Sequence, residues 1–240
     1  TNESLRSVIG QHFFRYTPTF FAMSYFSVYL DYLYPKGGTG ALMRTLADYG
    51  AGQGVTIHQG NGVARLDPDR RTIVCDDGAE YEYGALVWAA DLNALYSSVD
   101  LSRLSDPRGR RAIETRRDEL RRHAGGDSVF SVFLSVDEAP EYFRSKAEGH
   151  FFYTPDPRGL GDVHTRGLDA LVDALEHGRA GRDEVVAYLR EFLARNTFEI
   201  SVPVLKDPSM APPGQTGLSV SWLFDYRRTE LIRERGWYEE

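Results

Sequence analysis

The amino-acid sequence predicts a protein of the α+β class, and three observations support this prediction. Apolar residues recur at helical spacing in some segments, as in residues 40–48. In other segments they alternate with polar residues, the period of a strand with one buried face, as in residues 218–224. Turn sequences rich in Asp, Pro and Gly separate neighbouring short strands, which indicates antiparallel pairing.

The composition restricts the class of function. The chain has 240 residues, 42% of them hydrophobic and 12% aromatic, which is enough to bury a core in one large domain or two small ones. Its formal net charge of −7 argues against nucleic-acid binding and favours a small molecule as the partner. The single cysteine, Cys75, excludes an internal disulfide and indicates a reducing compartment. We expect Cys75 itself to lie in a buried strand.

The sequence contains no recognisable targeting or membrane-spanning segment. The first ten residues lack the basic and apolar regions of a signal peptide. The longest nearly uncharged apolar run, residues 20–30, is shorter than the roughly 20 residues that span a bilayer. We therefore expect a cytoplasmic protein, with peripheral contact to a membrane surface left open. Because the chain begins at Thr1 without a Met and ends within a helical pattern, we expect it to be a piece of a longer protein.

Residues 1–34 are rich in aromatic side chains whose spacing fits helical turns interrupted at Pro18. Packing in a core is the simpler interpretation of these side chains, and lining of a ligand site is the alternative. A short amphipathic helix is then predicted over residues 40–48, ended by the sequence GAGQG at 50–54. The glycines at 37, 38 and 40 therefore stand at the start of this helix.

The following segment predicts an antiparallel meander and then a charged connection. A more apolar strand over residues 85–90 is expected to close the sheet. Residues 107–123 are charged on nearly all sides, which predicts a solvated helix or linker. The other expected strands of the meander are 54–60, 62–67 and 71–77, followed by the segment 79–91 that contains the closing strand, with turn sequences at 67–69 and 76–78.

A second block combines strands and helices, and its Pro- and Gly-rich segment at 206–217 is expected to be a loop. Residues 35–100 thus interleave with a body made of 1–34 and roughly 125–224, as when a substrate domain is inserted in a cofactor domain. The expected elements of this block are strands at 128–136 and 150–154, two helices with apolar faces at 168–175 and 185–193, and alternating strands at 198–204 and 218–224.

The glycine-rich stretch does not fit a phosphate-binding loop. No Gly-Lys-Ser/Thr follows it, as a Walker A loop requires. A dinucleotide fingerprint fails as well, because Gly40 is followed by Ala41, Leu42 and Met43 where a third glycine is needed. We expect instead that Gly37 and Gly38 permit an unusual backbone path, and that Gly38 or Thr39 caps the helix.

No catalytic or metal-binding group of residues stands out. The six histidines show no close pairing or H-E-x-x-H spacing, so no metal site is predicted. The sequence Gly-x-Ser-x-Gly of a hydrolase nucleophile is absent. The aspartates at 67, 69, 76 and 77 are typical turn residues. The sequence therefore assigns no catalytic residue.

Several longer strings, taken together, resemble one family of flavoproteins. The string YPKGGTGALMRTLADYGAGQGVTIHQGNGVARL begins at Tyr34, and YGALVWAADLNALY begins at Tyr83. Further along lie SVFLSVDEAPEYF, HFFYTP and ISVPVLKDPSMAPPG, the last beginning at Ile200. These strings resemble the phytoene desaturase, carotenoid isomerase and retinol saturase family over nearly the whole chain, apart from residues 156–196.

The resemblance implies a fold, a cofactor and a division into parts. In the full-length protein it implies an α/β fold with FAD in a Rossmann-like domain that contains the meander, and an inserted substrate domain of mixed sheet and helices. Two parts of such an enzyme are missing here, the N-terminal dinucleotide fingerprint and the C-terminal flavin segment, so the fragment is expected to bind FAD weakly or not at all and to be inactive alone. The implied parts are 1–34 and 125–240 for the substrate domain, 35–100 for the FAD domain, and 101–124 for a charged helical connection.

The resemblance also implies roles for individual residues. Val63 matches a position whose backbone approaches the adenine, and Ala89, Ala90 and Asp91 match the turn after the strand that runs beside the dinucleotide. Gly37 and Gly38 match the glycines at the domain junction, where the backbone passes near flavin and substrate. The candidates for the substrate pocket are Phe13, Phe14, Phe20, Phe21 and Tyr25.

The leading hypothesis is an FAD-dependent oxidoreductase that removes or adds hydrogen at carbon–carbon bonds of an apolar polyene or isoprenoid substrate by hydride transfer with flavin. Within the same superfamily the alternatives are an amine oxidase, which would need an aromatic cage and a lysine near the flavin, and a redox-neutral isomerase. The alternative of another class is a non-catalytic lipid-binding module that contacts a membrane surface through residues 20–34.

Overall fold

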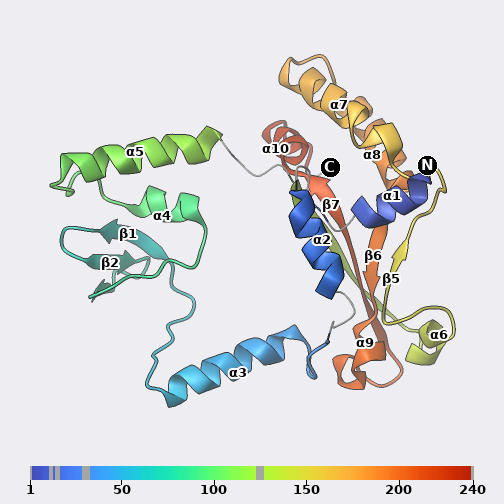
Figure 1. The fold of residues 1–240 in the computed structure, drawn as a ribbon, viewed down its shortest axis with the longest axis horizontal. Coiled ribbons are helices and arrows are strands. Elements are labelled where there is room, and N and C mark those ends of the chain that lie inside the picture. The colour runs from blue at the N-terminus through green and yellow to red at the C-terminus, as the bar shows by residue number, and fades with distance from the viewer. Residues whose placement is uncertain (1, 11–12, 14–16, 29–32, 123–126, 239–240) are drawn as a thin grey trace. The chain divides into compact units, whose positions relative to one another are not determined.

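A computed structural model describes residues 2–10, 13, 17–28, 33–122 and 127–238. The chain divides into two compact units, one made of Thr1–Leu46 and Gly125–Glu240 and the other of Ala47–Ala124 (Figure 1). Both units mix helices with antiparallel sheet, so the predicted α+β class is confirmed. The assignment of residue ranges to a cofactor domain and a substrate domain stays a prediction.

The unit of residues 47–124 contains the predicted meander. Its three strands, β1 (Val63–Asp67), β2 (Thr72–Cys75) and β3 (Glu80–Glu82), pair antiparallel in the order β1-β2-β3. Cys75 is buried in β2, as predicted. Two helices complete the unit, α4 (Leu92–Ser98) and α5 (Pro107–Arg122), and the latter is the predicted charged helix.

Two predicted strands of this unit are wrong. Residues 54–60 and 85–90 form no strand, and apart from the half-buried Trp88 their apolar side chains are exposed; Val87 is 87% exposed and Val55 is 55% exposed. A strand exists only where its backbone groups pair with a neighbour. No strand of the described part of the chain pairs with either segment, so alternation and apolar character were not sufficient.

The other unit is built on a four-stranded antiparallel sheet of order β4-β7-β6-β5. In the register of its long central pair, Phe130 faces Trp222 and Val132 faces Val220. The strands predicted at 128–136, 150–154 and 218–224 are confirmed. Their observed bounds, with the fourth strand, are β4 (Asp127–Val136), β5 (His150–Tyr153), β6 (Phe198–Ser201) and β7 (Thr216–Asp225).

The strand predicted at 198–204 is shorter than expected, because β6 ends at Ser201. Pro203 has no amide hydrogen for a ladder and instead begins the short helix α9 (Pro203–Lys206). The predicted loop at 206–217 is largely irregular but contains a 3₁₀ turn, η3 (Pro208–Met210). These changes place Lys206 and Asp207 on a tight turn after the sheet.

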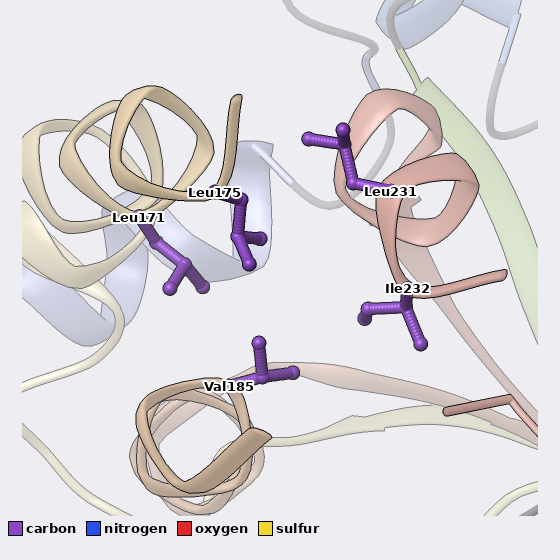
Figure 2. Close-up of a cluster of buried hydrophobic side chains, with 5 residues drawn as sticks. All are labelled: Leu171, Leu175, Val185, Leu231 and Ile232. Carbon is purple, nitrogen blue, oxygen red and sulfur yellow. The ribbon is translucent and has the colours of Figure 1, made fainter. Parts of the chain in front are cut away.

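Three helices form the apolar core beside the sheet. The two predicted helices are confirmed as α7 (Arg166–Glu176) and α8 (Arg182–Arg195), and α10 (Tyr226–Glu234) packs against α7. Leucines of α7 and Val185 of α8 point toward Leu231 and Ile232 of α10 (Figure 2). The remaining elements of this unit are α1 (Glu3–Gly10), α2 (Thr19–Val28), α6 (Pro140–Arg144) and η2 (Gly161–Val163).

Helix α3 (Thr39–Gly52) links the two units in sequence and is longer than the predicted 40–48. The helix continues through Gly50 and Gly52, and the backbone turns away at Gly54, where φ is +85°. Glycine at the position after a helix end adopts this left-handed conformation without a Cβ clash. The helix therefore extends past the first glycine of GAGQG and ends at the second, Gly52.

A buried arginine ties α10 to the sheet and to α8. The side chain of Arg228 is fully buried, and its guanidinium carbon lies 3.8 Å from the ring centroid of Phe224. The same carbon lies 5.3 Å from the rings of both Tyr188 and Phe192. Burial raises the pKa of Tyr188 to about 12, with the charge of Arg228 acting in the opposite direction. The arginine thus occupies an aromatic cage within the core.

Candidate functional site

The junction loop, residues 34–38, leads directly into α3 and has an unusual backbone. Gly37 has φ +82° and Gly38 has φ +76°, which confirms the predicted need for glycine at both positions. The Gly38 amide donates to the Pro35 carbonyl at 3.0 Å, closing a tight turn. Because α3 begins at Thr39, Gly38 is the residue before its first turn, and the Gly38 carbonyl accepts from the Ala41 amide at 3.0 Å.

Asp207 holds this loop from the opposite end of the sequence. Its Oδ2 accepts a hydrogen bond from the Gly37 amide at 2.6 Å. Its Oδ1 accepts from the Ser209 amide at 3.0 Å and from Ser209 Oγ at 2.8 Å. These bonds, the one from Gly37 first, hold the pKa of Asp207 below its ordinary value. The Gly37 amide is therefore engaged by a carboxylate of the protein, which agrees with the conclusion that the loop is not a phosphate site.

Lys206 lies at the same turn and reaches the junction loop. Its Nζ lies 4.9 Å from the centroid of the Tyr34 ring and 3.5 Å from Ser201 Oγ. Its stem crosses Gly149, where an added Cβ would come within 2.8 Å of Lys206 Cγ. Burial lowers the pKa of Lys206, while the charge of Glu199 acts in the opposite direction. The lysine is thus positioned by the absence of a side chain at Gly149.

A histidine and a glutamate stand on the sheet face next to this lysine. His150 of β5 pairs with Ser201 of β6, and Phe152 pairs with Glu199. Since alternate residues of a strand share a face, His150, Glu199 and Ser201 lie on one side of the sheet. His150 Nε2 is 2.8 Å from Glu199 Oε1, and the two side chains are 25% and 42% exposed. We call Tyr34, His150, Glu199, Ser201 and Lys206 the junction cluster.

The aromatic residues predicted for the substrate pocket do not gather in a pocket among the described residues. The rings of Phe13 and Tyr25 meet edge to face with centroids 5.7 Å apart. Phe20 and Phe21, on α2, are 73% and 53% exposed. Phe14 lies outside the described residues. The role of these five residues in substrate binding stays a prediction.

The residues predicted to bind the cofactor lie in the unit of residues 47–124. Val63 opens β1 at a register irregularity and is half-buried. Ala89 and Ala90 are exposed and precede α4. The Asp91 carboxylate caps α4 by accepting the Ala94 amide at 2.8 Å, and its carbonyl accepts from Trp88 Nε1 at 2.9 Å. This turn is well defined, and its part in cofactor binding stays a prediction.

Sequence reasoning did not single out four ionisable residues at or near the junction loop, namely Lys206, Asp207, His150 and Glu199. Asp207 precedes Pro208 and Ser209, a sequence that favours a turn closed by the aspartate side chain. That signal places Asp207 on a turn without indicating Gly37 as its partner. No pattern in the sequence indicates that His150 and Glu199 face the same side of neighbouring strands.

The two stretches that the sequence resemblance places beside the FAD, one in each unit, consist of small residues. Gly37 and Gly38 carry no side chain, and Ala89 and Ala90 carry only methyl groups, so each stretch permits close approach to its backbone. At Gly38 an added Cβ would lie 2.8 Å from Met210 Cε, so the space beside this backbone is already narrow. A flat ring needs such surfaces more than it needs charged ligands. The small residues of both stretches are compatible with a flat ring, and contact of either stretch with FAD stays a prediction.

Comparison with known proteins identifies the class of protein. A family model described as flavin containing amine oxidoreductase matches residues 13–234. The chain belongs to this family. The family is one of flavin enzymes, which confirms the FAD prediction at the level of the family and leaves the phytoene desaturase subgroup as a proposal. No curated protein matches the chain.

Two solved structures are similar to the chain at low sequence identity. One is reduced UDP-galactopyranose mutase, at 12% identity with a TM-score of 0.46, covering 82% of this chain and 34% of that one. The other is a structural-genomics target from Pyrococcus furiosus, at 11% identity with a TM-score of 0.43, covering 85% of this chain and 39% of that one. The chain thus spans little more than a third of the length of these proteins.

None of the described helices combines the length and the hydropathy that crossing a bilayer requires.

Proposed function

We propose that the chain is part of an FAD-dependent oxidoreductase that acts on carbon–carbon bonds of an apolar polyene or isoprenoid substrate. Membership in the flavin containing amine oxidoreductase family supports the cofactor and the reaction class. The structural observation that supports a site for this reaction is the junction loop. Its two glycines have positive φ, Asp207 accepts the amide of Gly37, and the junction cluster contacts the loop through Tyr34.

The roles that this proposal assigns to the flavin and to the residues of the chain follow from their chemistry. Flavin, when bound, supplies the capacity to accept or return a hydride. Gly37 and Gly38 provide backbone that permits close approach, and Asp207 keeps that backbone in place. The exposed aromatic residues Phe20 and Phe21 of α2 provide apolar surface for a long hydrocarbon. Cofactor contacts at Val63 and at 89–91 belong to the same proposal.

A second candidate function, amine oxidation, is favoured by one specific observation. An amine oxidase needs an aromatic side chain and a lysine near the flavin, and Lys206 lies over the Tyr34 ring at the junction loop. A redox-neutral isomerase of the same family would use the same loop. The hypothesis of a polyene substrate rests on the sequence strings that resemble phytoene desaturases. The hypothesis of an amine substrate rests on the pair Lys206 and Tyr34.

The test starts with the protein expressed with its flanking sequence. We expect a yellow protein whose absorption spectrum is that of oxidised flavin. A colourless, flavin-free product would overturn both the polyene and the amine hypothesis. Under anaerobic conditions, phytoene in detergent micelles should bleach the flavin, whereas benzylamine should not. If benzylamine bleaches the flavin and phytoene does not, and if Lys206→Met abolishes this bleaching, the amine hypothesis is supported instead.

Contact with a membrane surface is a separate part of the proposal. Helix α2 has no charged residue, and Phe20, Phe21 and Met23 are 53% to 73% exposed. Flotation of the protein with liposomes, compared with the variant Phe20→Ser/Met23→Ser, measures this contact. We expect flotation of the natural protein to fall in the variant. Flotation without flavin binding would favour the non-catalytic lipid-binding module.

A further inference from the structure

The ring of His150 is held in one orientation by two neighbours on the sheet face. Its Nε2 lies 2.8 Å from Glu199 Oε1. Its plane meets the Phe152 ring at 74° with centroids 5.4 Å apart. An ionised carboxylate can only accept a hydrogen bond, so Nε2 carries the hydrogen and donates it to Glu199. In the neutral ring the lone pair therefore resides on Nδ1, which is the atom able to take up a proton.

A short series of contacts connects this histidine with the junction loop. His150 is the cross-strand partner of Ser201, and Ser201 Oγ is 3.5 Å from Lys206 Nζ. Lys206 packs on Gly149, the residue before His150, and its Nζ stands over Tyr34. All of these residues belong to the same compact unit. Lys206 thus connects the strand pair that carries the histidine with the junction loop, where the proposed function places flavin and substrate.

Removal of hydrogen from a carbon–carbon single bond produces a proton as well as a hydride. One C–H bond breaks and its electron pair leaves with the hydrogen as hydride to the flavin. The C–H bond on the adjacent carbon then breaks, its electron pair forms the new double bond, and its proton needs an acceptor. A histidine with a carboxylate partner is a common acceptor for such a proton. In the saturating direction the same group returns the proton.

We propose that His150 is the catalytic acid–base residue of the reaction and that Glu199 is the residue that positions it. The inference rests on the proposed function, because the proton arises only if hydride leaves a carbon–carbon bond. Among the described residues the charged neighbours on this face are Glu199 of β6, which bonds the His150 ring, and Lys206 of α9, which lies beside Ser201, the cross-strand partner of His150.

The kinetic test uses the flavin-loaded protein with phytoene in detergent micelles as the probe. In His150→Gln the anaerobic rate of flavin bleaching should fall about 10²- to 10⁴-fold, the usual contribution of a general base. The matched control is His177→Gln, which changes an exposed histidine at the end of α7 and should leave the rate unchanged. In His150→Ala, added imidazole should restore part of the rate, with a pH dependence set by the imidazole.

The outcomes separate the inference from the proposed function. If the natural protein binds flavin and phytoene does not bleach it, the proposed function fails and the inference fails with it. If phytoene bleaches the flavin equally fast in His150→Gln and His177→Gln, the inference is overturned and the function stands. Equal flavin content and melting temperature in all variants show that a loss of rate is not a loss of folding.

A second measurement does not depend on activity. In protein labelled with ¹⁵N-histidine, the nitrogen chemical shifts report which ring nitrogen carries hydrogen. We expect the Nε2–H form at His150 in the natural protein, and a mixture of both forms in Glu199→Gln, where the side-chain amide can donate as well as accept. The Nδ1–H form in the natural protein would overturn the inference, because Nδ1 could then not accept the proton.

Discussion

The amide of Gly37 donates to the carboxylate of Asp207 at 2.6 Å, a hydrogen bond between residues 170 positions apart. Gly37 lies two residues before the start of α3, and Asp207 directly follows the short helix α9, which comes after the strand β6. The bond thus fixes the loop at the entrance to α3 against the turn that carries Lys206. Hydrogen bonds to charged acceptors are stronger than neutral ones, so we expect this contact to contribute to the stability of the junction loop.

Asp207→Asn should lower the melting temperature at neutral pH. It should also remove the part of the protein's loss of stability in acid that comes from protonation of Asp207. Folded Asp207 has a lowered pKa because it accepts the Gly37 amide and two bonds from Ser209. Its contribution to stability is therefore present above the ordinary aspartate pKa of about 4 and is lost as the pH falls through the lowered, folded value. We expect the difference in melting temperature between natural protein and variant to be constant from about pH 5 upwards and to shrink below about pH 4.

The matched control for this series is Asp137→Asn, which removes the charge of an exposed aspartate from the same unit. Melting curves recorded from acid to neutral pH should show little change for this control. A difference between Asp207→Asn and natural protein that stays constant down to pH 3 would contradict the assignment of the acid dependence to Asp207.

Features of the fold that depend on neighbouring residues could be predicted from the sequence. The meander β1-β2-β3 follows from alternation and from the turn sequences after Asp67 and Asp76. Helices α7 and α8 follow from apolar faces such as Leu168, Leu171 and Leu175. In each case the residues that stabilise an element lie within a few positions of one another, so the pattern contains the required information.

Features that depend on distant partners could not be predicted. Residues 85–90 read as a strand because they are apolar, but no strand of the described part pairs with them. Gly37 and Gly38 were recognisable because positive φ requires glycine, whereas their partner Asp207 was not. The pairing of His150 with Glu199 depends on the register of β5 against β6, and a shift by one residue would place them on opposite faces.

Gly38→Ala should destabilise the protein by about 1 to 2 kcal/mol, because alanine at φ +76° pays the cost of the left-handed conformation. The added methyl would also meet Met210 at Cε, 2.8 Å away, but that atom ends a flexible side chain and can move. Urea unfolding at neutral pH measures the change. The double variant Gly38→Ala/Met210→Ala should destabilise at least as much relative to Met210→Ala if the backbone conformation is the cause.

Gly52→Ala provides the matched control for the glycine variant. Gly52 lies in α3, where its φ is helical and nothing lies within 4 Å of an added Cβ. Alanine should therefore leave stability unchanged or raise it by up to about 1 kcal/mol. Equal stability losses in Gly38→Ala and Gly52→Ala would contradict the explanation based on φ.

Arg228→Ala should destabilise the protein by about 2 to 5 kcal/mol, the range for truncation of a large buried side chain. Arg228 is fully buried, its guanidinium carbon lies 3.8 Å from the Phe224 ring, and its helix α10 supplies Leu231 and Ile232 to the core. Arg228→Met keeps most of the side-chain volume without the charge and should lose less stability than the alanine variant.

Arg233→Ala, at an exposed position of the same helix, is the matched control and should change stability by no more than about 0.5 kcal/mol. Urea unfolding of the four proteins decides the matter: if Arg228→Ala is as stable as Arg233→Ala, the aromatic cage contributes nothing to the fold. If Arg228→Met is less stable than Arg228→Ala, volume is not what the arginine provides.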